Sequence, residues 1–95
     1  MSFRLLVQFP VKADQVNAFL ELMQTAKSRI ANAEGCEGVE VLHSIETPTK
    51  VILSEVWQSR ELHDVYAEKM RASGSMNAMA DFLAGAPESE YFEVL

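Results

Sequence analysis

The stretch VEVLHSIETPTKVILSEVW, residues 39–57, contains two apolar runs separated by a short polar segment. Runs rich in valine, isoleucine and leucine are typical of β-strands, and Pro48 in the polar segment indicates a turn. A connection this short requires the two strands to run antiparallel. We therefore predict a β-hairpin built from strands 39–45 and 50–57.

The position of the turn sets which residues of the hairpin face each other. A turn centred on residues 47–48 places Glu40 opposite Glu55. The same register places Gly38 opposite Trp57, on the same face of the sheet, because side chains alternate along a strand. Two carboxylates in cross-strand contact destabilise a sheet by up to about 1 kcal/mol. A nearby cation, a shared proton or exposure to water would relieve the repulsion between them.

Two further strands and a helix are expected around the hairpin. Residues 3–9 predict a strand that ends at Pro10, and residues 90–95 predict a last strand. Residues 14–33 predict a helix, with Asp14 as its N-cap and Gly35 as its C-terminal stop. One face of this helix is apolar because residues recur at helical spacing, namely Val16, Phe19, Leu20, Met23, Ala26 and Ile30.

The second helical segment starts after the hairpin. Ser59 is a candidate N-cap, and an apolar stripe follows it. The stretch Ser73-Gly74-Ser75 interrupts this helix. The helix restarts in a methionine-rich segment containing Met76, Met79, Ala80 and Leu83, and it stops at Gly85 and Pro87.

The resulting order, β-α-β-β-α-β with a broken second helix, predicts an α+β ferredoxin-like fold with a four-stranded antiparallel sheet. With 95 residues the chain has room for a single domain, residues 1–95. Helices cover one face of such a sheet. The other face also carries apolar side chains, so we expect it to pack against a second copy and form a homodimer.

The charge and composition exclude several classes of function. A net charge of -6 argues against binding nucleic acid or an anionic membrane. No apolar run is long enough for a membrane helix. Gln8 and Pro10 interrupt the apolar N-terminus, so we expect no export signal and a cytoplasmic location. Cys36 is the single cysteine, which allows no internal disulfide and no cysteine-based zinc site.

Few residues of the chain carry recognisable chemistry. His43 and His63 lack metal-ligand spacing, so no metal site is predicted. The best lead is a pocket between helix and sheet that holds Trp57 and Tyr66, with His63 at its rim. The alternative is that both aromatic residues belong to the core and that His63 lies on the surface.

A family resemblance extends over almost the whole chain. It is carried by Glu37-Gly38-Val39-Glu40, by the run from Val51 to Leu62 that contains Glu55-Val56-Trp57-Gln58-Ser59, and by Leu83-Ala84-Gly85-Ala86-Pro87. With these motifs the chain resembles the antibiotic biosynthesis monooxygenase family. The resemblance implies a ferredoxin-like unit whose sheet faces that of a second subunit in a dimeric α+β barrel. It also implies a pocket between the helices and the sheet.

The resemblance implies residue roles as well. Trp57 matches a family tryptophan that lines the pocket in some oxygenases, and Tyr66 falls where relatives place a histidine or an aromatic residue. The segment 71–76 lacks the pocket histidine of many relatives. The Asn-Trp-His set of the haem-degrading members is not recognisable, which argues against haem. The general base is left open between His63, His43 and Gln8.

These observations give one leading hypothesis and two alternatives. The leading one is a cofactor-independent monooxygenase that acts on a small quinol or phenol, with O2 as co-substrate. Its pocket is expected to contain Trp57, Tyr66, Gln8 and Met70, with His63 or His43 assisting proton removal. One alternative is a non-catalytic dimer that binds a small ligand. The other is a cofactor-free isomerase or detoxifying enzyme that acts on a small metabolite.

Overall fold

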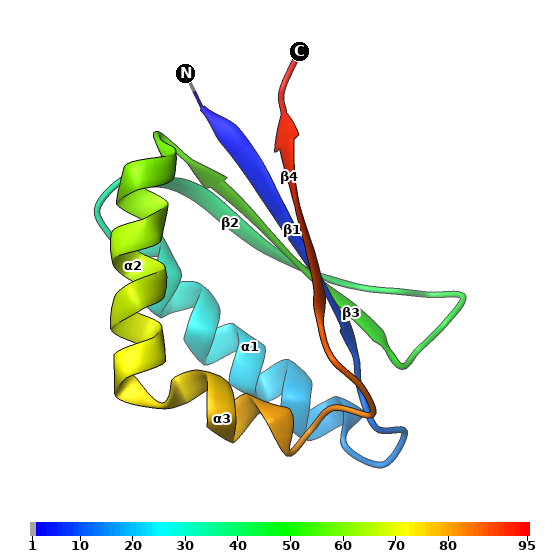
Figure 1. The fold of residues 1–95 in the computed structure, drawn as a ribbon. Helices are drawn as coiled ribbons and strands as arrows, with labels where there is room; N and C mark the ends of the chain where they lie inside the picture. The colour runs from blue at the N-terminus through cyan, green and yellow to red at the C-terminus, as the bar shows by residue number, and fades with distance from the viewer. Residues whose placement is uncertain (1) are drawn as a thin grey trace.

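The structure is a computed structural model that describes residues 2–95, apart from the side chains of Ser75 and Met76. Its elements are, in order, β1 (Phe3–Pro10), α1 (Val16–Ala31), β2 (Cys36–His43), β3 (Lys50–Trp57), α2 (Arg60–Ser73), α3 (Ser75–Ala80) and β4 (Glu88–Glu93). The strands form an antiparallel sheet in the order β2-β3-β1-β4. The helices lie on one face of this sheet (Figure 1). The predicted α+β ferredoxin-like fold is confirmed.

The start of α1 differs from the prediction. The helix begins at Val16 rather than at residue 14, and no side chain caps it. The preceding residues form a turn in which the Gln15 N–H donates to the carbonyl oxygen of Lys12 over 2.9 Å. Asp14 lies in this turn, so its carboxylate does not cap the helix.

The second helical segment begins and breaks as predicted. The Ser59 side chain accepts a hydrogen bond from the Leu62 N–H over 3.2 Å, which makes Ser59 the N-cap of α2. Gly74, at φ 77°, ends α2 and opens α3. The helix then restarts as α3, and the side chain of Met76, one of the residues expected in this restart, lies outside the described part of the chain.

The register of the hairpin differs from the predicted one by one residue. Glu40 faces Ser54, and Val39 faces Glu55. The loop that joins the strands is longer than expected, because β2 ends at His43 rather than at residue 45, while β3 begins at Lys50 as predicted. Within this loop the Ser44 Oγ accepts from the Thr47 N–H over 2.9 Å. A shift of one residue moves a side chain to the other face of the sheet. The predicted contact between the two carboxylates is therefore wrong: Glu55 faces the helices and Glu40 faces away from them.

The end of the hairpin is also different from the prediction. A bulge between Cys36 and Gly38 places Cys36, and not Gly38, opposite Trp57. Strand β2 consequently starts three residues earlier than expected and ends at His43. The last strand is shifted toward the N-terminus as well, to Glu88–Glu93.

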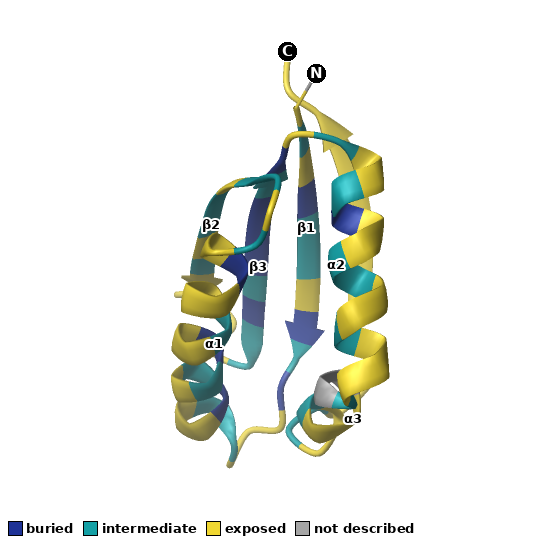
Figure 2. Cartoon of the chain, turned by 90° about the vertical axis from the view of Figure 1, so that its left-hand side faces the viewer, coloured by how far each residue is buried: buried dark blue, intermediate teal, exposed yellow. Residues whose placement is uncertain are grey.

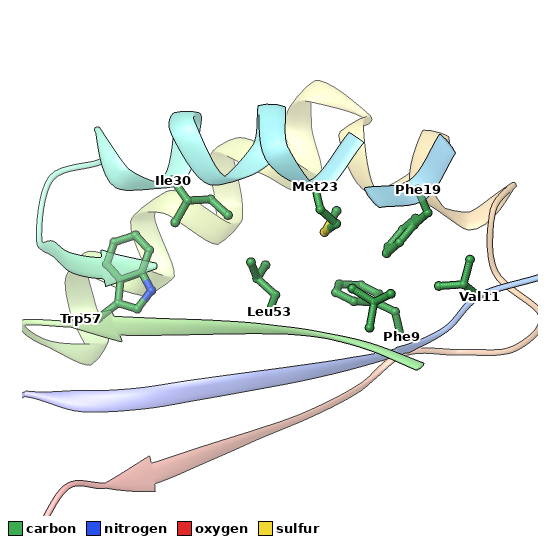
Figure 3. Packing of buried hydrophobic residues seen from close by; sticks show 8 residues of the cluster. Phe9, Val11, Phe19, Met23, Ile30, Leu53 and Trp57 are labelled. Atoms are coloured by element: carbon green, nitrogen blue, oxygen red, sulfur yellow. The ribbon is translucent and has the colours of Figure 1, made fainter. Parts of the chain in front are cut away.

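The core lies between α1 and the sheet. Figure 3 shows Phe19, Met23 and Ile30 pointing from α1 toward the sheet, as the helical spacing predicts. The cluster of buried residues consists of Phe9, Val11, Phe19, Met23, Ile30, Val51, Leu53 and Trp57. Trp57 lies at one end of this core and Val11 at the other (Figure 3). The burial colours of Figure 2 show the same pattern, with β3 the most deeply buried strand.

The second face of the sheet has no helix over it (Figure 1). The pairing of the strands places a set of apolar side chains on this open face, namely Leu6, Leu42, Ile52, Val56 and Phe92. Leu42 is 48% exposed and Phe92 is 40% exposed. None of the helices formed by residues 2–95 is long and apolar enough to cross a membrane.

Gly35 joins α1 to β2 at a point of close contact. Its φ is 90°, a conformation that side chains disfavour. A Cβ at this position would lie 2.6 Å from the Leu62 Cδ1 atom of α2. The carbonyl oxygen of Gly35 also accepts from the Gln58 N–H over 2.8 Å. Gly35 therefore allows the start of α2 to pack against the connection between α1 and β2.

We expect Gly35→Ala to lower the free energy of unfolding by about 2–4 kcal/mol, from left-handed strain and overpacking against Leu62. Urea unfolding at neutral pH measures this change. Gly85→Ala is the matched control, since a Cβ there meets only Pro10 at an ordinary 3.7 Å. A Gly35→Ala variant as stable as Gly85→Ala would show that this contact does not constrain the fold.

Candidate functional site

A cavity of about 430 Å³ lies between the helices and the sheet. Ligand pockets commonly have volumes of about 300–1,000 Å³, so this one has the size for a small organic molecule. Its lining comes from every helix and from three strands. The apolar lining residues are Leu5, Val7, Phe9, Leu22, Met23, Ala26, Ile30, Leu53, Ala67, Met70, Met79, Ala80, Leu83 and Pro87. The polar or ionisable ones are Arg29, Glu55, His63, Tyr66, Ser89 and Tyr91.

Several of the polar lining residues gather around Trp57. The indole ring lies 5.2 Å from the ring of His63 and 5.4 Å from the ring of Tyr66, measured between centroids. The ring of His63 in turn lies 5.7 Å from that of Tyr91. Because Trp57 occupies one end of the core (Figure 3), these side chains mark one end of the cavity as polar.

Glu55 is the buried acid of this polar end. It is 5% exposed and lines the cavity. The Trp57 Nε1–H donates to its Oε1 atom over 2.7 Å. Burial raises the pKa of Glu55 above its ordinary 4.5, and the hydrogen bond from Trp57 partly offsets the shift. The alternation of β3 brings the two side chains together, since residues two apart share a face.

His63 reaches the cavity from the first turns of α2. It is 8% exposed, and its Nδ1 atom lies 3.3 Å from the Oη of Tyr91, in hydrogen-bond contact. Burial lowers the pKa of His63 below 6.5, while the nearby Asp64 opposes the shift. The Nδ1 atom lies 3.8 Å from the Asp64 carboxylate. At neutral pH the imidazole is therefore uncharged and linked to β4 through Tyr91.

Tyr66 and Met70 follow His63 on the same face of α2, at offsets of three and seven residues. Both line the cavity. Burial raises the pKa of the Tyr66 hydroxyl, and the negative charge of Glu55 adds to this increase. Tyr66 thus remains protonated and able to donate a hydrogen bond.

The structure brings together only some of the residues expected at the site. His63, Tyr66 and Met70 line the cavity, with His63 inside it rather than at its rim. Trp57 is 0% exposed and lies behind the lining, in contact with His63 and Tyr66.

His43 and Gln8 lie elsewhere. His43 is exposed at the hairpin, where its Nε2 atom is 2.8 Å from the carbonyl oxygen of Pro48. Gln8 pairs with Ile52 and lies on the open face of the sheet. Neither residue lines the cavity.

Two residues of the polar end, Glu55 and Tyr91, were not predicted to line the cavity. Glu55 has a local signal, because Glu-x-Trp in a strand places an acid beside an indole N–H on the same face. The predicted register hid this signal by pairing Glu55 with Glu40. Tyr91 has no such signal, since its contact with His63 joins residues 28 positions apart.

The described residues offer little support for a metal site or a reactive thiol. Within residues 2–95, no three histidine, cysteine or acidic side chains gather in a group that could hold a metal ion. Cys36 is half-buried, and burial raises the pKa of its thiol. The raised pKa disfavours the reactive thiolate.

The hydrogen bond between Trp57 and Glu55 makes a prediction about stability. Glu55→Ala leaves the buried indole N–H without an acceptor, so we expect the free energy of unfolding to fall by about 1–3 kcal/mol. Glu55→Gln keeps an acceptor oxygen and should cost less. Urea unfolding of both variants measures the difference. Equal losses would show that the hydrogen bond contributes nothing to stability.

The raised pKa of Glu55 also predicts how the free energy of unfolding depends on pH. The raised pKa means that the protonated carboxyl favours folding, and this contribution is lost as pH rises from 4.5 through the raised value. We therefore expect Glu55→Gln to gain stability relative to the unmodified chain between about pH 4 and about pH 8. A constant difference across this range would contradict the raised pKa.

The fold is shared with several solved structures. A protein of Nitrosomonas europaea assigned to the antibiotic biosynthesis monooxygenases matches 99% of this chain and 90% of its own, with 21% identity and a TM-score of 0.90. A conserved protein of Methanosarcina mazei matches 100% of this chain and 94% of its own, with 18% identity and a TM-score of 0.90. SnoaB of Streptomyces nogalater, a cofactor-independent oxygenase, matches 98% of this chain and 92% of its own. Its identity is 12% and its TM-score is 0.84. At these identities the similarity establishes the fold alone.

The family follows from the sequence itself. A comparison with curated protein sequences gives no match. The family model described as "Antibiotic biosynthesis monooxygenase" matches residues 2–70, which is more than half of the chain and includes β1 through most of α2. The chain therefore belongs to the antibiotic biosynthesis monooxygenase family.

Proposed function

We propose that this protein is a cofactor-independent monooxygenase that oxidises a small phenol or quinol. The observation that carries the proposal is the apolar cavity with Glu55, His63, Tyr66 and Tyr91 at one end. An aromatic ring fits the apolar part, and its hydroxyl group fits the polar end. Membership of a monooxygenase family supports the reaction class.

The substrate supplies all electrons of the proposed reaction. Loss of the hydroxyl proton gives an electron-rich phenolate, which passes one electron to O2. The resulting radical pair combines to form a carbon–oxygen bond, and the peroxide then loses water to leave a new carbonyl group. Overall, a phenol and O2 give a quinone and water. The substrate loses four electrons and O2 gains four, so no cofactor is needed.

The protein's part in this reaction is positioning and proton transfer. The apolar lining holds the ring and keeps water from the reactive anion. The polar end removes the hydroxyl proton, with His63 assisting, and Tyr66 donates a hydrogen bond to the resulting oxygen anion. We assign no step to His43 or Gln8, since both lie outside the cavity.

We also propose a homodimer that forms through the open face of the sheet. Each of the four strands contributes at least one apolar side chain to this face, and Leu42 and Phe92 are exposed. Covering them with a second copy would bury apolar area that one chain leaves in water. The family resemblance supports the same arrangement.

Reducing the cavity should abolish turnover without unfolding the protein. Ala26→Leu adds bulk to a lining residue of α1, and leucine is a good helix former. We expect oxygen uptake with a panel of phenols and quinols, in chelator-treated buffer, to fall to the autoxidation rate. The control is Ala18→Leu on the exposed side of the same helix, which should keep full activity.

The outcomes separate the candidate functions. If the unmodified protein takes up oxygen and Ala26→Leu takes it up at the same rate, the reaction does not occur in this cavity. Ligand binding without any oxygen uptake would favour a non-catalytic binding dimer over an oxygenase.

A charge on the open face should disrupt the dimer. We expect Leu42→Glu to halve the mass measured by sedimentation, since it replaces an exposed apolar side chain by a carboxylate that association would have to bury. Ile45→Glu is the matched control, because Ile45 is 96% exposed on the loop of the hairpin. A Leu42→Glu variant that keeps the mass of the unmodified protein would place the interface elsewhere.

A further inference from the structure

We infer that Glu55 is the residue that accepts the proton from the hydroxyl group of a bound phenol, and that Trp57 positions its carboxylate. This inference rests on the proposed function for the identity of the substrate. It concerns a residue to which the family resemblance assigns no role, and it follows from the surroundings of the carboxyl group.

The first argument is that Glu55 is buried without a balancing cation. It is 5% exposed, and among residues 2–95 neither the ion pair of Arg71 with Glu68 nor the contact of the neutral His63 with Asp64 includes it. Buried carboxylates in folded proteins are normally paired with a positive charge. An acid kept in an apolar cavity without such a pair is a candidate for function.

The second argument concerns the groups that face Glu55 from the neighbouring elements. Tyr66 of α2 and Cys36 of β2 interact with its charge, and both would be neutral or negative. His63 is held neutral by burial. Arg29 of α1 lines the same cavity, but the ion pairs of the described residues do not join it to Glu55. The carboxylate is therefore free to accept a hydrogen bond from a neutral donor, such as a phenolic hydroxyl group.

The third argument is that the structural role of Glu55 does not require an acid. The buried indole N–H of Trp57 needs an acceptor, and Oε1 of Glu55 provides it at 2.7 Å. A glutamine would provide the same oxygen. The acidic group is therefore what remains to be explained, and Glu55→Gln separates the two roles.

His63 is less suited to be the proton acceptor. Its Nδ1 atom is engaged with Tyr91, and burial keeps its pKa below the ordinary value, which weakens it as a base near neutral pH. The pKa of Glu55 moves in the opposite direction, toward the working range of a general base. His63 then serves to hold Tyr91 against the cavity.

The proton transfer is balanced and involves no change of oxidation state. The O–H bond of the phenol breaks, and its proton forms an O–H bond on the Glu55 carboxylate. The electron pair of the broken bond stays on the phenolate oxygen. When the peroxide loses water, Glu55 returns this proton to the leaving oxygen and is again ionised.

Matched ligands with and without a hydroxyl group test the contact directly. The probes are 4-methylphenol and toluene, measured by titration calorimetry at several pH values. With the unmodified protein, we expect 4-methylphenol to bind about tenfold more tightly once Glu55 is ionised, since an ionised acceptor strengthens a hydrogen bond. Toluene should show no such gain. With Glu55→Gln, the pH dependence of 4-methylphenol binding should disappear, and its persistence would overturn the inference.

The emission of Trp57 gives a second readout that needs no ligand. Trp57 is the single tryptophan of the chain, and its N–H contacts the group in question. We expect a pH transition of its emission above 4.5 that Glu55→Gln lacks and His63→Asn keeps. A transition that follows His63 instead would overturn the assignment of the titrating group to Glu55.

Trp57→Phe tests positioning rather than mere packing. The phenyl ring keeps much of the apolar contact but cannot donate the hydrogen bond. In the unmodified protein this hydrogen bond lowers the pKa of Glu55, so its loss should raise that pKa. The pH at which 4-methylphenol binding strengthens should therefore shift upward. An unchanged pH profile would contradict a positioning role for Trp57.

Oxygen uptake then separates this inference from the proposed function. With a phenol that the unmodified protein oxidises, Glu55→Gln should lower kcat about 100-fold or more while KM changes little, as expected for a lost general base. Full turnover in Glu55→Gln would overturn the inference and leave the oxygenase proposal intact. Absence of uptake by the unmodified protein, together with the expected binding profile, would remove the oxygenase proposal but retain Glu55 as the acceptor of the hydroxyl group.

Discussion

The hydrogen bond from the Trp57 indole to the Glu55 carboxyl connects the folding of this small domain to its cavity. Trp57 is the last residue of β3, and it lies opposite Cys36 of β2 and against the rings of His63 and Tyr66 of α2. The position of the indole therefore fixes where α2 can start. A buried N–H requires an acceptor, and the sheet supplies it two residues earlier on the same strand. The acceptor happens to be the acid that faces the cavity, so the core and the site share one contact.

The elements of the fold were predictable because each depends on local sequence. Helical spacing predicted which face of α1 is buried, and Ser59 and Gly74 marked the start and the break of the second helical segment. The hairpin register was not predictable, because it depends on hydrogen bonds inside the loop. The Ser44 Oγ accepts from the Thr47 N–H and lengthens the connection. A local detail of the turn thus decided that Val39, and not Glu40, lies opposite Glu55.

Part of the candidate site was also predictable from local sequence. Tyr66 and Met70 lie on one helix face with His63, and this grouping follows from spacing alone. Side chains of β1 alternate between the two faces of the sheet. Val7 and Phe9 face the cavity, so Gln8, which lies between them, faces away from it. Tyr91 lies beyond such reasoning. Its contact with His63 depends on β4 pairing with β1 at the edge of the sheet, a long-range arrangement that no short motif encodes.

The cavity and the open face of the sheet are connected through stability. The cavity leaves its apolar lining without the contacts that a filled core would provide, and the buried carboxyl group of Glu55 adds a desolvation cost. A domain of 95 residues buries a smaller share of its surface on folding than a larger domain does, so it has less stability with which to offset these costs. An occupant of the cavity stabilises the fold by mass action, and a second copy on the open face adds apolar burial that one subunit lacks. The proposed dimer is therefore what would allow so small a domain to keep a binding cavity in its centre.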